Sequence, residues 1–138
     1  MIDPATAGSP TPKSPRDFGV VISARTQGAA AERRAERHLR WRGWRLCARN
    51  WIGGGGELDL VFARWKTLLI VEVRQRPTIE EAFVSIDTPK LQRTVLAARA
   101  LVRAYHLERY RLRIDLVAVD ADGRITRHRD VVPFGLSD

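Results

Sequence analysis

The sequence predicts an α/β protein in which helices flank a mixed β-sheet, and two observations lead to this prediction. In two segments, apolar residues recur every three or four positions, which is typical of helices that bury one face. Around these segments lie short runs rich in Leu, Val, Ile and Phe, separated by polar turns, as in strands. The predicted order is helix, three strands, helix and then two strands, of which the last is the weakest.

The first predicted helix spans about residues 28–42. Ala31, Ala35 and Leu39 form one apolar stripe along it, and Gly43 is placed to end it. Before the helix, residues 1–25 contain four prolines among Ser, Thr and Gly, with no apolar period before Val20. We therefore expect residues 1–25 to be a flexible tail and residues 26–138 to form a single domain.

Strands are predicted at residues 44–51, 57–64, 68–74, 111–119 and, more weakly, 124–132. In the first of them, Trp44, Leu46 and Ala48 are expected on one face, with Arg45 and Cys47 on the other. The glycine run at residues 53–56 precedes a strand and not a helix. It therefore lacks the context of a phosphate-binding loop, and we interpret it as a flexible turn.

The second helix is predicted to begin at Thr88 as the N-cap, with Pro89 as its first helical residue, and to end near Tyr105. The stretch of residues 75–88 before it is expected to be a loop with a helical turn near residues 80–84. Asp115, in the strand that follows, alternates with apolar neighbours, so we expect it to pair with Arg113 or Arg111.

The chain has a net charge of +8 and a pI of about 10.9, which favours binding to polyanions such as DNA or RNA. The alternative is a composition bias, because the sequence has only three lysines and arginine dominates the basic residues. DNA is the more favoured of the two nucleic acids, and a homodimer is possible.

Cys47 is the single cysteine, so no disulfide can form within the chain, which favours the reducing cytoplasm. We interpret its side chain as a small buried apolar group. There is no apolar run of the roughly 20 residues needed to span a bilayer, and the first residues lack the pattern of a secretory signal. The expectation is a cytoplasmic protein that does not bind membranes.

The stretch of residues 53–76 carries the most chemical information. If Trp65 and Lys66 form a two-residue hairpin loop, Asp59 falls opposite Glu72 on the neighbouring strand. Opposed residues have Cβ atoms about 4.5–5.5 Å apart, and two carboxylates so close repel each other. A divalent cation such as Mg²⁺ would neutralise them and could polarise a phosphodiester.

The alternative is that arginines neutralise these carboxylates without any metal. Glu72 could pair with Arg74, Arg76 or Arg113, and Asp59 with another arginine. Buried carboxylates occur in structural networks as well as in active sites, so the pattern alone leaves both interpretations open.

A series of short motifs resembles the YraN-like family of small bacterial proteins over about residues 25–132. The motifs are GxxxE at residues 28–32, ARNW at 48–51, GELDLV at 56–61, VEVRQR at 71–76, then Lys90, and RIDLV at 113–117. The resemblance implies a restriction-endonuclease-like fold, similar to Holliday-junction resolvases, with the PD-(D/E)XK pattern. Because fold does not fix function, it implies the activity less directly.

The resemblance also implies roles for individual residues. Asp59 matches the first metal-binding aspartate, Glu72 the acidic residue of the (D/E)XK element, and Glu32 an additional carboxylate ligand, with Mg²⁺ or Mn²⁺ as the metal. Arg74 stands where the pattern has lysine. An arginine stays protonated and cannot activate a water molecule as a base, although it could stabilise charge on a phosphate.

Four residues are candidates for contacts with nucleic acid: Arg74, Gln75, Arg76 and Lys90. Lys90, in the first turn of its helix, could reach a phosphate, and a plain surface lysine is an equal alternative. Three tryptophans near the arginine-rich helix could stack on bases, but at least two are expected to be core residues: Trp41, Trp44 and Trp51. The three histidines lack ligand spacing, so no histidine zinc site is expected.

Three functions follow from these patterns. The first is a metal-dependent nuclease-like protein that acts on DNA, including branched or structured DNA, with Asp59, Glu72 and Arg74 as the catalytic residues. The second is a nucleic-acid-binding module whose active site has decayed, as Arg74 suggests. The third is a regulatory or protein-interaction role for the proline-rich tail.

Overall fold

In a computed structural model of the chain, the structure describes residues 29–131. The predicted tail, residues 1–25, lies outside the described residues. The elements in chain order are α1 (Ala29–Trp41), β1 (Arg45–Gly53), β2 (Gly56–Arg64), β3 (Thr67–Gln75), α2 (Ile79–Val84), α3 (Thr88–Tyr105), β4 (Arg111–Val119) and β5 (Ile125–His128). This confirms the predicted α/β class and order of elements, and the helical turn expected near residues 80–84 is the short helix α2.

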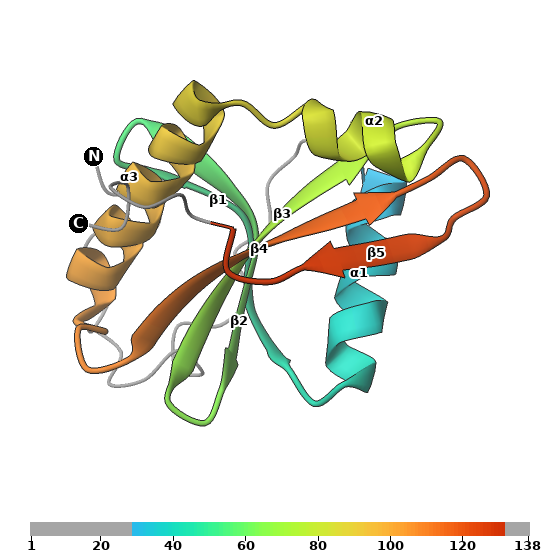
Figure 1. The fold of residues 1–138 in the computed structure, drawn as a ribbon. Coiled ribbons are helices and arrows are strands. Elements are labelled where there is room, and N and C mark those ends of the chain that lie inside the picture. Colours follow the sequence, from blue (N-terminus) through green and yellow to red (C-terminus); the bar gives the residue numbers. More distant parts are fainter. Residues whose placement is uncertain (1–28, 132–138) are drawn as a thin grey trace.

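The five strands form one mixed sheet in the order β1-β2-β3-β4-β5 (Figure 1). Neighbouring strands are antiparallel except β3 and β4, which are parallel. Antiparallel strands can be joined by tight turns, whereas a parallel pair needs a crossover, and here α2 and α3 supply it. The result is consistent with the predicted nuclease-like architecture.

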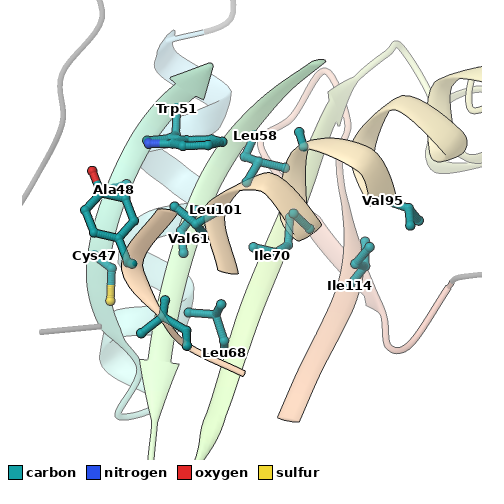
Figure 2. Close-up of a cluster of buried hydrophobic side chains, with 14 residues drawn as sticks. Cys47, Ala48, Trp51, Leu58, Val61, Leu68, Ile70, Val95, Leu101 and Ile114 are labelled. Carbon is teal, nitrogen blue, oxygen red and sulfur yellow. The ribbon is translucent and has the colours of Figure 1, made fainter. Parts of the chain in front are cut away.

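Helices α1 and α3 cover opposite faces of the sheet (Figure 1). Along β2 and β3, alternate side chains belong to different cores: Val61 and Ile70 pack with α3, whereas Leu60 and Val71 pack with α1. Figure 2 shows the α3-side core, in which Leu101 of α3 lies over Val61. Both faces of these central strands are therefore buried, as expected for strands this rich in Leu, Val and Ile. Among residues 29–131, no helix is both long and apolar enough to cross a bilayer.

Local hydrogen bonds fix where the two later helices begin. Thr78 caps α2 and forms a reciprocal capping box with Glu81, which turns part of the expected loop into a helix. The N-cap of α3 is Asp87, whose carboxylate accepts a hydrogen bond from the backbone N–H of Lys90 at 2.9 Å. The prediction of Thr88 as the cap was wrong by one residue, because the carboxylate of Asp87 takes that role.

The first strand departs from the predicted alternation. A β-bulge between Leu46 and Ala48 shifts its register with β2, so that Cys47 and Ala48 both lie in the α3-side core. The expectation that they face opposite ways was wrong for this reason, whereas the burial of the Cys47 thiol is confirmed. The last strand, β5, is shorter than the predicted 124–132.

The glycine run forms the turn between β1 and β2, and α3 packs against it. A Cβ atom on Gly54 would lie 2.7 Å from the backbone oxygen of Leu96, and one on Gly56 would lie 2.6 Å from that of Arg93. These glycines therefore allow the backbone of α3 to pack closely against the turn. The interpretation of the glycine run as a flexible turn did not include this packing.

Candidate functional site

The hairpin register predicted from the two-residue loop is confirmed for the five residue pairs nearest the loop, whereas the predicted pair of Asp59 and Glu72 is not among the backbone pairs of residues 29–131. Strands β2 and β3 pair from Arg64 with Thr67 through Val61 with Ile70 to Leu60 with Val71. Asp59 and Glu72 come next along each strand, on the buried part of the sheet, with 4% and 1% of their surfaces exposed.

Beyond Leu60 and Val71, the two strands are joined by a hydrogen bond between a backbone and a side chain. The Oδ2 atom of Asp59 accepts a hydrogen bond from the backbone N–H of Val73 at 2.9 Å. Because Val73 belongs to β3, this bond ties the carboxylate to the strand that carries Glu72. The position of Asp59 is therefore set in part by the backbone of the neighbouring strand.

Glu72 has two cationic neighbours, and both approach the same oxygen. Its Oε1 atom lies 3.5 Å from Nζ of Lys90 and 3.6 Å from Nη2 of Arg74. Its Oε2 atom is buried and has no hydrogen-bond partner among residues 29–131. A buried acceptor without a partner is costly, so this oxygen is available to a ligand that brings positive charge.

The surroundings of Glu72 oppose its ionisation. Burial and, next, the negative charge of Asp59 raise the pKa of Glu72 from 4.5 to about 7, although Lys90 and Arg74 partly oppose the rise. Near neutral pH, it is therefore unfavourable for both carboxylates to carry a negative charge. A cation between them would offset this repulsion.

Glu32, the third predicted ligand, has another contact. Its Oε1 atom accepts a hydrogen bond from Nδ2 of Asn50 at 3.2 Å. In the described part of the chain, no three His, Cys, Asp or Glu side chains gather as a metal site. The structure therefore brings Asp59 and Glu72 together but does not add Glu32 to them as a third ligand.

The residues predicted to contact nucleic acid divide into two groups. Arg74 and Lys90 lie at the carboxylate pair, with 22% and 27% of their side chains exposed. Gln75 and Arg76 are exposed at the end of β3, where Nη1 of Arg76 donates to the carbonyl oxygen of Gln75 at 2.7 Å. Only the first group could reach a molecule bound at the carboxylates directly.

The closeness of Lys90 to Glu72 is the feature that sequence reasoning missed. Eighteen positions separate the two residues in the chain, and no local spacing relates them. The available signal was the cap at Asp87 and Pro89, because the first turn that they fix places Lys90 at the N-terminal end of α3.

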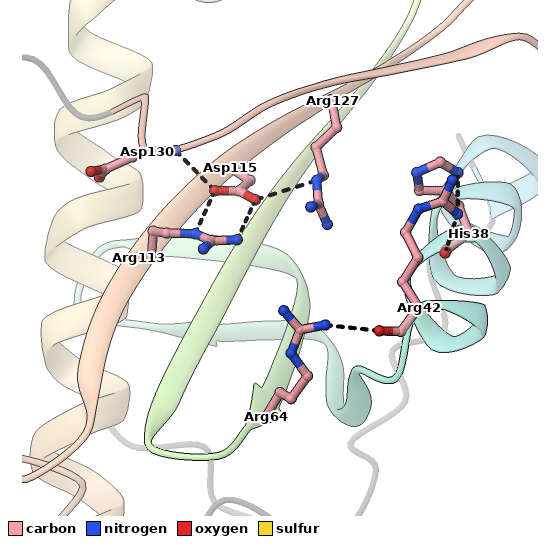
Figure 3. A network of polar contacts seen from close by, with 7 residues as sticks. All are labelled: His38, Arg42, Arg64, Arg113, Asp115, Arg127 and Asp130. Atoms are coloured by element: carbon pink, nitrogen blue, oxygen red, sulfur yellow. Dashed lines mark hydrogen bonds and ion pairs between the residues drawn. The ribbon is translucent and has the colours of Figure 1, made fainter.

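The opposite face of the sheet buries another carboxylate, Asp115 of β4 (Figure 3). Arg113 binds it with two hydrogen bonds of 3.1 and 3.0 Å, as predicted for this pair. Arg127 lies 3.8 Å away, and the backbone N–H of Asp130 donates at 2.9 Å. This carboxylate is fully satisfied by the protein, in contrast to Glu72.

The tryptophans also separate clearly. Trp44 and Trp51 are core residues, with 3% and 1% exposed, whereas Trp41 is 90% exposed at the end of α1. The expectation that at least two of the three belong to the core is confirmed.

Comparison with known proteins places the chain in a family. Residues 31–119 match the family described as "Uncharacterised protein family UPF0102". Three bacterial proteins named as UPF0102 proteins illustrate the similarity. One from Pseudomonas fluorescens is 40% identical over 101 residues, covering 71% of this chain and 82% of its own length. One from Dinoroseobacter shibae is 38% identical, covering 73% and 76%. One from Erythrobacter litoralis is 37% identical, covering 76% and 90%. The chain, with its buried carboxylate pair, therefore belongs to the UPF0102 family, the YraN-like family that its motifs indicated.

Proposed function

We propose that this protein is a cytoplasmic, metal-dependent nuclease-like protein that acts on DNA, with Asp59 and Glu72 as the core of its active site. The observation that carries the proposal is the unpartnered Oε2 of Glu72, buried beside the carboxylate of Asp59. Oxygen donors of this kind suit Mg²⁺ or Mn²⁺.

The residues present fit such an ion. Asp59 and Glu72 would hold it, and water and a phosphate oxygen would complete its ligands, since Mg²⁺ is commonly held by one or two carboxylates. When bound, Mg²⁺ or Mn²⁺ would polarise the scissile phosphate and lower the pKa of the attacking water. Glu32 would join as a third ligand only after its side chain moved toward the pair, because the three carboxylates do not gather as a metal site among residues 29–131.

The two cationic side chains beside Glu72 would have different roles, one in binding the phosphate and one in proton transfer. Arg74 would contact the scissile phosphate and stabilise its developing charge, which a guanidinium does without losing a proton. Lys90 supplies the amine that the (D/E)XK position lacks, since an ammonium group can give up a proton and a guanidinium cannot. Gln75 and Arg76 would hold the flanking backbone.

The test is cleavage of labelled single-stranded, duplex and four-way branched DNA with Mg²⁺ or Mn²⁺. We expect the wild type to cleave at least one substrate and Asp59→Asn to cleave none. Asp122→Asn is the matched control, because Asp122 is exposed in the turn before β5 and should not affect cleavage. Equal activity of wild type and Asp59→Asn would refute catalysis at this site.

A second comparison tests the assignment of Lys90. Lys90→Arg keeps the positive charge but removes the dissociable proton, so it should retain DNA binding and lose most of the cleavage rate. If Lys90→Arg cleaves as fast as the wild type, Lys90 serves only as a charge beside Glu72.

A nucleic-acid-binding module with a decayed active site is the second candidate, and the observation that favours it is Arg74 in the lysine position. It predicts salt-sensitive binding to DNA without cleavage in any metal. Cleavage gained by Arg74→Lys would support a decayed nuclease, whereas binding without cleavage in both forms would support a pure binder.

A further inference from the structure

The α1 side of the sheet carries a concentration of positive charge that the carboxylate pair does not explain. Four arginines lie on this side of the sheet, three of them on different strands and one just after α1, where its side chain extends to His38 (Figure 3). They are Arg42 after α1, Arg64 of β2, Arg113 of β4 and Arg127 of β5, and we call them the arginine cluster. Asp115 is the acidic group that binds two of them, Arg113 and Arg127.

Contacts hold the cluster together around the ring of Trp44. The Cζ atom of Arg64 lies 4.1 Å from the centroid of this ring, and that of Arg113 lies 5.4 Å from it. Nη1 of Arg64 also donates to the carbonyl oxygen of Arg42 at 2.8 Å. The guanidinium groups are thus positioned by packing and hydrogen bonds before any ligand arrives, which lowers the entropy lost on binding.

Arg127 is the member that points most directly to a ligand. Only 8% of its side chain is exposed, and its Nη1 atom is buried with no hydrogen-bond partner in the described part of the chain. Burial and the charges of Arg129, Arg113 and Arg42 lower its pKa, although Asp115 acts in the opposite direction. An unpaired donor among like charges is costly, and an anion would remove both costs.

A pocket of about 350 Å³ adjoins the cluster, between α1 and β5, and Arg42 belongs to both. Within residues 29–131, its lining contains no acidic residue and consists of Arg34, Arg37, His38, Trp41, Arg42 and Ile125. The pKa of His38 is lowered by burial and by the charges of Arg42 and Arg127, which disfavours the protonated ring. Trp41 contributes an indole that is 90% exposed beside these arginines.

We propose that the arginine cluster and this pocket form a binding site for single-stranded nucleic acid, remote from the carboxylate pair. The arginines would bind the phosphodiester backbone, and Trp41 would stack on an unpaired base. The exposed indole selects this ligand over a free phosphate, because base stacking on an aromatic side chain needs a base. The site shares its partner with the proposed nuclease, but its binding does not require cleavage.

The test is equilibrium binding of a fluorescent 12-nucleotide single strand in EDTA, measured by anisotropy across a range of salt. We expect Arg42→Gln/Arg64→Gln to weaken binding about tenfold or more. Each lost phosphate contact should also reduce the slope of log K against log salt by about 0.7, or about 1.4 for the pair. Both side chains are exposed, so the fold should survive the substitutions.

Matched controls separate this site from general charge attraction. Arg103→Gln/Arg109→Gln removes the same charge from exposed positions outside the cluster and should have a much smaller effect. Trp41→Ala should weaken binding of the single strand by about tenfold without changing competition by inorganic phosphate. Equal losses in the two arginine pairs, or phosphate binding without any binding of the strand, would overturn the proposal.

Asp59→Asn distinguishes this inference from the proposed function. It should bind the strand in EDTA as the wild type does, even if it cannot cleave. Loss of cleavage in every form with binding intact would refute the nuclease alone, whereas loss of this binding with cleavage intact would refute the remote site alone.

Discussion

The two faces of the sheet each bury an acidic side chain, and the protein neutralises the two in opposite ways. Glu72 and Asp115 lie on adjacent parallel strands, where Val71 pairs with Asp115 and Glu72 with Leu116. Because successive side chains point to opposite faces, Glu72 faces α3 and Asp115 faces α1. Asp115 has close partners for both oxygens, whereas Oε2 of Glu72 has none in the described chain.

This difference separates a structural carboxylate from a candidate ligand. Two hydrogen bonds from one guanidinium satisfy Asp115 with good geometry, and its charge in turn neutralises arginines. Glu72 receives two cations at 3.5 and 3.6 Å on one oxygen, while burial and the charge of the nearby Asp59 raise its pKa. A buried charge left in this state is typical of sites whose partner is a ligand.

Breaking the structural carboxylate should have the largest effect. Asp115→Asn leaves Arg113 and Arg127 without their counterion, and removal of one member of a buried ion pair costs about 3–5 kcal/mol. Urea unfolding should show this loss against Asp122→Asn, whose effect should stay within about 0.5 kcal/mol. A loss below about 1 kcal/mol for Asp115→Asn would contradict the structural role.

Neutralising Glu72, the candidate metal ligand, should stabilise the folded protein, whereas neutralising Asp115 destabilises it. The pKa of Glu72 is raised from 4.5 to about 7 in the folded state. Between these two pH values the folded protein keeps a proton on Glu72 that the unfolded chain has released. This contribution to stability is present below about pH 4.5 and is lost as the pH rises through 7, by up to about 3 kcal/mol. Glu72→Gln in EDTA should therefore lack this loss.

The measurement is the free energy of unfolding of both forms at pH 5 and pH 8. The stability of Glu72→Gln relative to the wild type should be higher at pH 8 than at pH 5. An identical pH dependence in the two forms would show that Glu72 ionises normally in the folded protein.

A bound metal ion should offset the loss of stability that ionised Glu72 causes. At pH 8, Mg²⁺ or Mn²⁺ at 100 times its dissociation constant should stabilise the wild type by about 2.7 kcal/mol. Thermal unfolding should show this shift for Asp122→Asn but not for Asp59→Asn or Glu72→Gln. An equal shift in all four proteins would mean that the metal binds elsewhere.

The smallest expected effect concerns Glu36, a fourth buried acid, which lies on α1. Burial tends to raise its pKa, but the hydrogen bonds and charges of Arg49 and Arg40 outweigh burial and lower it below 4.5. Its contribution to stability is present above pH 4.5 and is lost as the pH falls through the lowered pKa. Glu36→Gln should cost about 1 kcal/mol at pH 7, because Arg49 and Arg40 are partly exposed to solvent.

Unfolding at pH 7 and pH 3 measures this difference. The gap in stability between the wild type and Glu36→Gln should narrow from pH 7 to pH 3, because acid protonates Glu36. A constant gap at the two pH values would attribute the effect to packing and not to charge.

Sequence reasoning reached the fold and part of the site because these depend on local patterns. Alternation and the two-residue loop determine the β2–β3 register, so the approach of Asp59 and Glu72 could be predicted from one short segment. The pairing of Arg113 with Asp115 was predictable for the same reason, since residues two apart on a strand share a face.

Two features could not be predicted from local sequence patterns: the bulge at Cys47 and the hydrogen bond from Val73 to Asp59. Each depends on how one strand meets its neighbour, and alternation assumes that the ladder continues without interruption.

The sequence by itself determined the α/β class, the hairpin and the positive charge, because each follows from neighbours in the chain. Only the tertiary structure decided which charges from distant segments meet. It placed Lys90 of α3 beside Glu72 and brought Arg64 of β2 and Arg113 of β4 to the ring of Trp44. The physical reason is that packing α1 and α3 on opposite faces brings distant side chains within Coulomb range, and no spacing along the chain records that distance.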